Sequence, residues 1–240
     1  VNEGGTIVYT ATVNNAVTGS PLVIHLSNGS TITIPVGATS GTSSPVAVRV
    51  DDAYAQGNQN LTVGISSTSG GNYESLNTAS TVTTVVSDNG SVTNVTLSAA
   101  ASVNEGGAIV YTASVTNAVT STPLVINLSN GSSITIPVGA TSATSAPIAV
   151  RADDAYTQGN QNGSVSIAGT SGGNYESLNT TSSATTVVSD NGTVTTVSLS
   201  AVASVNEGGS LVYTATVNNA VTGTPLVITL SNGATISIPV

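Results

Sequence analysis

All eleven acidic residues of this 240-residue chain recur at fixed positions of a repeated sequence. The string VNEGG begins at Val1, Val103 and Val205, which sets a spacing of 102 residues between successive copies. In this register the acids fall into five sets: Glu3, Glu105 and Glu207; Asp51 and Asp153; Asp52 and Asp154; Glu74 and Glu176; Asp88 and Asp190. Because hard cations prefer carboxylate oxygens, the first chemistry that this pattern indicates is metal binding.

The elements that must position these acids are clearest in the middle copy, which is complete. Strands are predicted where apolar and polar residues alternate with a period of two. These segments are 95–99, 109–115, 124–128, 134–136, 148–150, 165–167 and 185–189. Asn130-Gly131 predicts a hairpin turn, and small residues predict a loop at 139–146. The sequence therefore predicts an all-β fold of tandem Ig-like antiparallel β-sandwich domains, with about seven strands each.

The repeat length is that of a small domain, so each copy is expected to fold around its own core. The Asn-Gly turns that follow Asp88 and Asp190 are the predicted boundaries. The expected domains are residues 1–90, which lack the first strand, residues 91–192, which are complete, and residues 193–240, the opening half of a third copy. The chain thus has the organisation of a piece of a longer array.

The order of the strands predicts where the acids gather. If every strand crosses the sandwich, alternate strand ends lie at opposite ends of the domain. Four acids of each copy are then expected at the end that faces the next domain: Glu3, Asp51, Asp52 and Asp88 in the first, and Glu105, Asp153, Asp154 and Asp190 in the second. Glu176 is expected at the opposite end, facing the preceding domain, where it either completes that domain's site or is merely solvated. Asn89 and Asn191 are further candidate ligands, and Glu207 is expected to belong to a third site whose remaining ligands lie beyond Val240.

Charge balance favours calcium at these positions. The formal net charge is −9, and the only cations are Arg49 and Arg151, which alternation places on the outer face of a strand. Two like charges 4 Å apart repel by about 1–4 kcal/mol near water. Ca²⁺ accepts about six to eight oxygen ligands in flexible geometry, whereas Mg²⁺ requires a tighter octahedron. Zn²⁺ prefers His and Cys, and the chain has one His and no Cys. The alternative is turn chemistry, in which Asp accepts hydrogen bonds from nearby backbone.

Other functions find less support in the sequence. Strong acidity argues against nucleic-acid partners, and the lack of a long apolar run argues against membrane insertion. The single histidine, His25, falls on the outward side of its strand. The chain has no second His and no Cys, so it lacks the base that a nucleophilic triad requires, and an enzyme is not predicted. Tyr9, Tyr111 and Tyr213 are predicted core residues. Tyr54, Tyr73, Tyr156 and Tyr175 lie near the domain ends, where they either brace loops or pack at junctions.

Long strings in the chain carry a family resemblance. VNEGGTIVYTATVNNAVTGSPLVIHL, VRADDAYTQGN and SGGNYESL resemble the tandem extender repeats of giant bacterial RTX adhesins of the LapA type. The resemblance implies Ig-like domains in a secreted fibre at the bacterial cell surface, exported by type I secretion and active in biofilms. It also implies calcium at the domain junctions, with cell anchoring and target binding carried by other parts of the protein.

The acids also resemble the calcium-ligand pattern of Calx-β domains. An early Glu, an Asp-Asp pair and a late Asp match Glu105, Asp153, Asp154 and Asp190, but neutral Gln158, Asn160 and Gln161 stand where further acids are usual. This departure favours one or few ions per junction.

Together these features predict a structural spacer whose partners are the neighbouring repeats of the same chain. The alternative is a ligand-binding module that recognises a glycan, ice or a protein surface.

Overall fold

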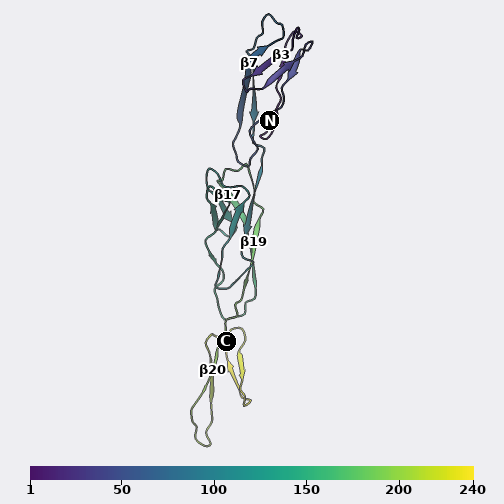
Figure 1. The fold of residues 1–240 in the computed structure, drawn as a ribbon. Helices are drawn as coiled ribbons and strands as arrows, with labels where there is room; N and C mark the ends of the chain where they lie inside the picture. Colours follow the sequence, from purple (N-terminus) through teal and green to yellow (C-terminus); the bar gives the residue numbers. More distant parts are fainter. The chain divides into compact units, whose positions relative to one another are not determined.

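The structure is a computed structural model that describes residues 1–240, and it consists of β-strands joined by turns (Figure 1). The strands of the first repeat are β1 (Thr6–Ile7), β2 (Thr10–Thr12), β3 (Leu22–Leu26), β4 (Thr31–Ile34), β5 (Ser40–Thr42), β6 (Val46–Ala47), β7 (Gln59–Ser69) and β8 (Thr81–Val86). Those of the middle repeat are β9 (Val92–Ser98), β10 (Ser102–Asn104), β11 (Ala108–Ile109), β12 (Thr112–Val115), β13 (Leu124–Leu128), β14 (Ser133–Ile136), β15 (Ser142–Thr144), β16 (Ile148–Ala149), β17 (Gln161–Ser171), β18 (Ser177–Asn179) and β19 (Ser183–Ser189). The third copy has β20 (Val197–Ala201), β21 (Tyr213–Val217), β22 (Leu226–Thr229) and β23 (Thr235–Ile238). The predicted all-β class is confirmed.

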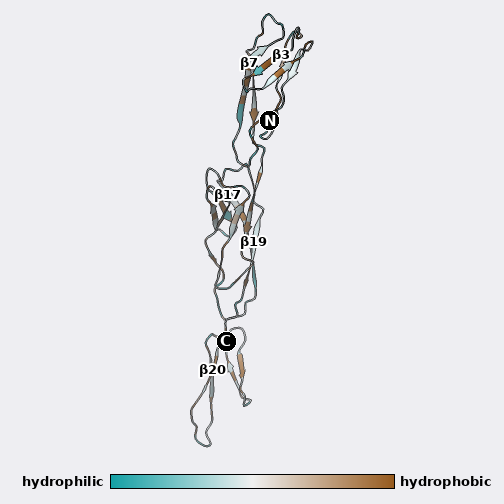
Figure 2. Ribbon diagram, in the orientation of Figure 1, coloured by the Kyte–Doolittle hydropathy of each residue, from teal (hydrophilic) through white to brown (hydrophobic).

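The core of the first repeat lies on a sheet with the strand order β4-β3-β7-β8. β3 and β4 pair antiparallel with Ile24 opposite Ile32, so the alternating side chains of both strands face the same side. The buried residues that share this core are Tyr9, Val17, Leu22, Ile24, Leu26, Ile32, Ile34 and Val63. Hydrophobic residues lie along the strands, as on β3 in Figure 2. The middle repeat reproduces this hairpin, with Ile126 opposite Ile134 between β13 and β14.

The strand predicted at 109–115 is interrupted, and this part of the prediction is wrong. In the first repeat the equivalent segment changes partner, because β1 pairs with β6 while β2 pairs with β5. Tyr9 lies at the break, where its N–H donates to Ser43 Oγ at 3.0 Å and its carbonyl accepts from Ser43 N at 2.9 Å. Pro45, which has no N–H to donate, lies between β5 and β6 and prevents one continuous ladder.

The loop predicted at 139–146 contains a strand, which is a second correction. β15 pairs antiparallel with β12 from Thr112 opposite Thr144 to Ser114 opposite Ser142. Its sequence is Ser-Ala-Thr, so composition alone indicates a loop. Pairing with a neighbouring strand decides the conformation here, since strand preference depends strongly on context.

The middle repeat also contains two parallel pairings that the antiparallel prediction omits. β9 pairs with β18, and β10 pairs with β19. β9 lies between β12 and β18 in a sheet of order β15-β12-β9-β18. β10 and β18 were not predicted, because segments of three residues are too short to show an alternating pattern.

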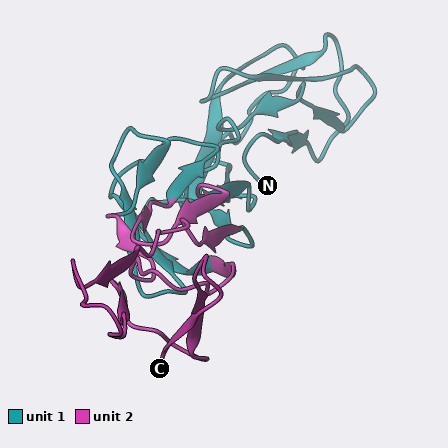
Figure 3. Cartoon of the chain, turned by 90° about the horizontal axis from the view of Figure 1, so that it is seen from below, with its two compact units in different colours: residues 1–97, 112–145, 166–183 teal, residues 98–111, 146–165, 184–240 magenta.

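The chain divides into two compact units (Figure 3). One contains residues 1–97, 112–145 and 166–183, and the other contains residues 98–111, 146–165 and 184–240. The third copy belongs to the second unit, where it forms the hairpins β20–β21 and β22–β23. The structure has no helix that is long and apolar enough to cross a membrane.

Candidate functional site

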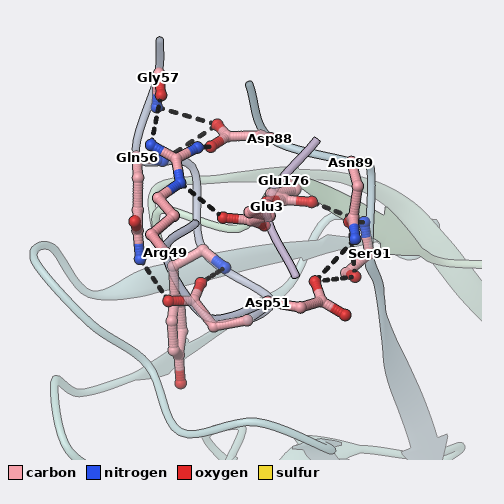
Figure 4. Close-up of polar contacts among 11 residues, drawn as sticks. Glu3, Arg49, Asp51, Gln56, Gly57, Asp88, Asn89, Ser91 and Glu176 are labelled. Atoms are coloured by element: carbon pink, nitrogen blue, oxygen red, sulfur yellow. Dashed lines mark hydrogen bonds and ion pairs between the residues drawn. The ribbon is translucent and has the colours of Figure 1, made fainter. Parts of the chain in front are cut away.

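Three carboxylates gather where the first repeat meets the second: Glu3, Asp88 and Glu176. They offer oxygens that all lie within 4.8 Å of one another (Figure 4). Glu3 precedes β1, Asp88 follows β8, and Glu176 lies between β17 and β18. The segment that carries Glu176 is held by backbone hydrogen bonds, since Glu176 N donates to Ala53 O at 3.1 Å. The cluster therefore contains acids from two successive repeats.

Arg49 neutralises part of this cluster. Its Nε donates to Glu3 Oε2 at 2.9 Å, and its Nη2 forms an ion pair with Asp88. Its Nη1 donates to Gly57 O at 2.8 Å. The prediction that Arg49 lies on an outer strand face is wrong, because β6 ends at Ala47 and the alternation does not continue to residue 49. A signal was present in the sequence, since the only two cations recur two residues before each Asp-Asp pair.

Two carboxylate oxygens at this junction have no partner. The Glu3 side chain has 0% of its surface exposed, yet its Oε1 accepts no hydrogen bond. Glu176 Oε1 is also buried without a partner, while its Oε2 accepts from Ser91 N at 2.6 Å. Three carboxylates face one guanidinium, so the cluster lacks positive charge. A buried anionic oxygen without a partner is costly, and the three carboxylates are a group that could hold a metal ion.

The pKa of Glu3 responds to this crowding. The neighbouring Glu176 carboxyl group, which would share a hydrogen bond with Glu3 if one of the two were protonated, raises the pKa of Glu3 most. Burial raises it further, and Arg49 acts in the opposite direction. The two carboxyl groups are thus placed so that a proton or a cation between them relieves their repulsion.

Asp51 and Asp52 lie outside the three-carboxylate cluster. Asp51 Oδ1 accepts from Asn89 Nδ2 at 2.8 Å and from Ser91 Oγ at 3.2 Å. Asp52 Oδ1 accepts from Tyr54 N at 2.7 Å, which is an Asx-type turn. Of the four acids predicted to converge in the first repeat, the structure brings Glu3 and Asp88 together.

Gly4 allows the Glu3 loop to approach the Asp51 backbone. Its φ is +70°, and an added Cβ would lie 3.0 Å from the Asp51 Cβ. Gly106 has the same relation to Asp153, with φ +74° and a distance of 2.9 Å. The positive φ and the close contact thus explain why the first residue after Glu in VNEGG is glycine in both repeats.

The second junction repeats the arginine centre. Arg151 Nε donates to Glu105 Oε2 at 3.1 Å, and its Nη2 forms an ion pair with Asp190. Backbone donation from Gly159 is the largest influence that holds the pKa of Asp190 below its ordinary value, with Gln158 N and Arg151 acting in the same direction.

The other predicted ligands of the second junction have equivalent partners to those in the first, with Thr193 in the place of Ser91. Asp153 accepts from Asn191 Nδ2 at 2.8 Å and from Thr193 Oγ1 at 3.2 Å. Asp154 accepts from Tyr156 N at 2.8 Å. The structure therefore keeps the arginine centre and the Asp-Asp turn unchanged from one repeat to the next.

A protein-family model named the LapA domain matches the chain three times, at residues 1–89, 91–191 and 193–240. The chain belongs to the LapA domain family. No curated protein matches it. The family agrees with the resemblance to LapA-type adhesin repeats, and it indicates an adhesin-related array.

The remaining acids of the LapA repeats are exposed. Glu74 occupies the same repeat position as Glu176, but it is solvent-exposed. Glu207 is exposed as well. Of these two equivalent residues, Glu176 joins an acidic cluster and Glu74 does not.

Tyrosines form a second set of contacts at the ends of the LapA repeats. The Tyr54 ring stacks on Tyr175 with centroids 5.6 Å apart, and its hydroxyl donates to Ala118 O at 2.7 Å. At the second junction the Tyr156 hydroxyl donates to Ala220 O at 2.9 Å. Both predicted roles occur. Tyr54 and Tyr156 pack at junctions, whereas the hydroxyls of Tyr73 and Tyr175 brace loops of their own repeats by donating to Asn15 O and Asn117 O, both at 2.7 Å.

Proposed function

We propose that these LapA repeats are the structural spacer of a bacterial surface adhesin, in which a Ca²⁺ ion joins each repeat to its successor. The observation that carries the proposal is the unpartnered Oε1 of the buried Glu3, which lies in a cluster with Glu176 of the next repeat. A cation bound there would contact residues of both repeats at once.

The donor set favours a hard cation with flexible coordination. Glu3, Asp88 and Glu176 supply only oxygen, and neither Cys nor His belongs to the cluster. Both oxygens of Asp88 already accept hydrogen bonds, from Arg49 and from Gln56 N at 3.0 Å. Ca²⁺ tolerates such shared carboxylates and adds water or carbonyl ligands, whereas Mg²⁺ requires near-octahedral geometry.

The proposed role of the ion is mechanical. Glu3 and Asp88 belong to the first repeat and Glu176 to the second, so a shared cation opposes bending at the linker that contains Asn89 and Ser91. A stiff linker keeps successive repeats extended, which suits a spacer that holds an adhesive region away from a secreting cell. The adhesive region and the cell anchor are assigned to other parts of such an adhesin, and the biological setting is biofilm attachment.

Isothermal titration calorimetry of the chelator-treated chain with CaCl₂ tests the proposal. We expect one site of clear affinity, at the first junction, and a loss of at least tenfold in Glu176→Gln. Glu74→Gln is the matched control, since Glu74 holds the same repeat position but is exposed. Unchanged binding in Glu176→Gln, or the absence of binding to the parent chain, would rule out a calcium site built across the junction.

A further inference from the structure

Two tyrosines are held together where the first repeat meets the second. The Tyr54 ring stacks on the Tyr175 ring, with centroids 5.6 Å apart and an angle of 29° between the ring planes. The two residues also form an antiparallel backbone bridge, next to which Ala55 N donates to Asn174 O at 3.0 Å. Because the main chain and the side chains pair together, the two rings keep one relative position in the folded protein.

The two phenol groups point the same way. The Tyr54 hydroxyl donates to Ala118 O and the Tyr175 hydroxyl donates to Asn117 O, both at 2.7 Å. These carbonyls belong to consecutive residues, so the two phenol oxygens lie at the same end of the stacked pair. The Cε carbons, which are ortho to the hydroxyl, therefore also lie at that end. A tyrosyl radical carries much of its unpaired spin on these carbons, so they are the atoms through which two such radicals couple.

The composition directs one-electron oxidation to tyrosine. Cys, Met and Trp, the other side chains that are readily oxidised, are absent, whereas seven tyrosines are present. Tyr9 and Tyr111 are buried, at 7% and 4% exposure, whereas Tyr54 and Tyr175 are half-buried and reach solvent. Tyr54 and Tyr175 are the one pair of stacked rings in residues 1–240. Oxidation of either ring therefore takes place beside a second ring of the same kind.

We propose that Tyr54 and Tyr175 form a dityrosine cross-link between the two repeats when the chain meets a one-electron oxidant, such as hydrogen peroxide acting through a haem peroxidase. Each phenol gives up one electron and its hydroxyl proton. The two radicals join through a Cε–Cε bond, and the hydrogen on each of these carbons then moves to the phenol oxygen, which restores both aromatic rings. The pair loses two hydrogen atoms in total, and hydrogen peroxide is reduced to two molecules of water.

The cross-link acts on the same junction as the proposed cation but does not depend on it. A bond between residues 54 and 175 joins the loop after the Asp-Asp pair of one repeat to the segment before β18 of the next. It removes freedom from the unfolded chain, as a disulfide does, in a protein that has no cysteine. The junction then stays joined in the absence of calcium.

Visible-light oxidation with tris(bipyridine)ruthenium(II) and persulfate, in calcium-free buffer and at low protein concentration, tests the cross-link. We expect a monomeric product with dityrosine fluorescence, a mass lower by two hydrogen atoms, and a proteolytic peptide pair that joins residue 54 to residue 175. Tyr54→Phe and Tyr175→Phe should each lose most of this fluorescence, although both variants keep the two aromatic rings. Tyr73→Phe and Tyr156→Phe are the matched controls, since these residues occupy the same repeat positions and stack on no other ring.

Urea unfolding of the oxidised chain shows whether the bond holds the repeats together. The oxidised parent chain should unfold at a higher urea concentration than the untreated chain, and oxidised Tyr54→Phe should show no such shift. Dityrosine that forms at equal yield in Tyr54→Phe, or cross-linked peptides that join other tyrosine pairs instead, would overturn the proposal. Oxidation that yields only cross-links between molecules would overturn it as well, since the stacked rings would then not be placed to couple.

Discussion

The first and second junctions share the same arginine centre but differ in the carboxylates that surround it. Each has an arginine that joins a buried glutamate to an aspartate, namely Arg49 with Glu3 and Asp88, and Arg151 with Glu105 and Asp190. Only the first also receives a carboxylate from the following repeat, because the 240 residues hold no counterpart of Glu176 beyond it.

The two junctions also differ in the hydrogen bonding of their buried glutamate. Glu3 Oε1 has no hydrogen-bond partner, whereas Glu105 Oε1 accepts from Asn191 N at 3.4 Å. A repeat thus balances most of its own acids internally, and the excess negative charge arises when the successor adds its glutamate.

Substitution of the two arginines should cause the largest loss of stability, and the response of each variant to calcium should distinguish the two junctions most clearly. Arg49→Met and Arg151→Met each leave a buried carboxylate without its partner, so each should lower the free energy of unfolding of its repeat by about 3–5 kcal/mol. Adding CaCl₂ should restore part of the loss in Arg49→Met only, since a cation can replace the guanidinium where three carboxylates gather. Urea unfolding with and without calcium measures this, and equal rescue of both variants would contradict the distinction.

Tyrosine truncations should show the next effect. Tyr54→Phe and Tyr156→Phe each remove one hydroxyl hydrogen bond, to Ala118 O and Ala220 O, and should each cost about 1 kcal/mol. Tyr54→Ala should cost about 0.5–1.5 kcal/mol more than expected from Tyr156→Ala, since only Tyr54 stacks on a ring, that of Tyr175. Urea midpoints of the four variants provide the comparison. Equal costs for the two Ala variants would show that the stack adds nothing.

Asp52→Asn separates turn chemistry from metal binding. Asp52 accepts from Tyr54 N and from the Gln56 amide, so the variant should lower stability by about 0.5–1 kcal/mol. Its calcium affinity should stay within about twofold of the parent chain, because Asp52 lies outside the three-carboxylate cluster. Calorimetry that shows a loss as large as that of Glu176→Gln would return Asp52 to the ligand set first predicted.

The smallest expected effect is on the pH dependence of stability in the absence of calcium. Asp190 at the second junction and Glu3 at the first should contribute to it with opposite signs. The pKa of Asp190 is lowered from its ordinary 3.8, so its contribution to stability is complete above that value and is lost as the pH falls through the folded pKa. The pKa of Glu3 is raised from 4.5, so the folded state binds the proton more readily and its contribution is lost as the pH rises.

Unfolding of Asp190→Asn and Glu176→Gln between pH 6 and pH 3 checks both signs. Relative to the parent chain, Asp190→Asn should lose less stability on acidification, since the titrating group is absent. Glu176→Gln should gain less from it, since the Glu3–Glu176 repulsion is already removed. The reverse order would contradict the assignment of these shifts to the two junctions.

The fold was largely predictable from the sequence, and the site only in part. The alternation in β3, β4, β13 and β14 identified the strands, because these segments are half-buried and their side chains alternate between core and solvent. The predicted strand order also placed Glu3 and Asp88 at one end of the first repeat. It placed Glu176 at the facing end of the second repeat, and the three residues form one cluster in the structure.

The failures came where partners far along the chain decide the outcome. Arg49 lies beyond the end of β6, so strand alternation did not apply to it. Asp51 follows Arg49 by two residues, yet it lies outside the cluster because Asn89 and Ser91, 38 and 40 residues further along the chain, donate to its carboxylate. No local pattern carries this information, because it depends on which donors the folded chain brings within reach.

The most direct test of the central claim measures the stiffness of the first junction itself. The chain has no cysteine, so spin labels can be placed at Val36 and Val138, equivalent exposed positions of successive repeats at 52% and 53% exposure. Pulsed electron–electron double resonance then reports the spread of distances between the two repeats. A cation shared by Glu3, Asp88 and Glu176 predicts a narrower distribution with CaCl₂ than with EDTA, and no narrowing in Glu176→Gln. A distribution that calcium leaves unchanged, or that narrows equally in Glu176→Gln, would contradict the account.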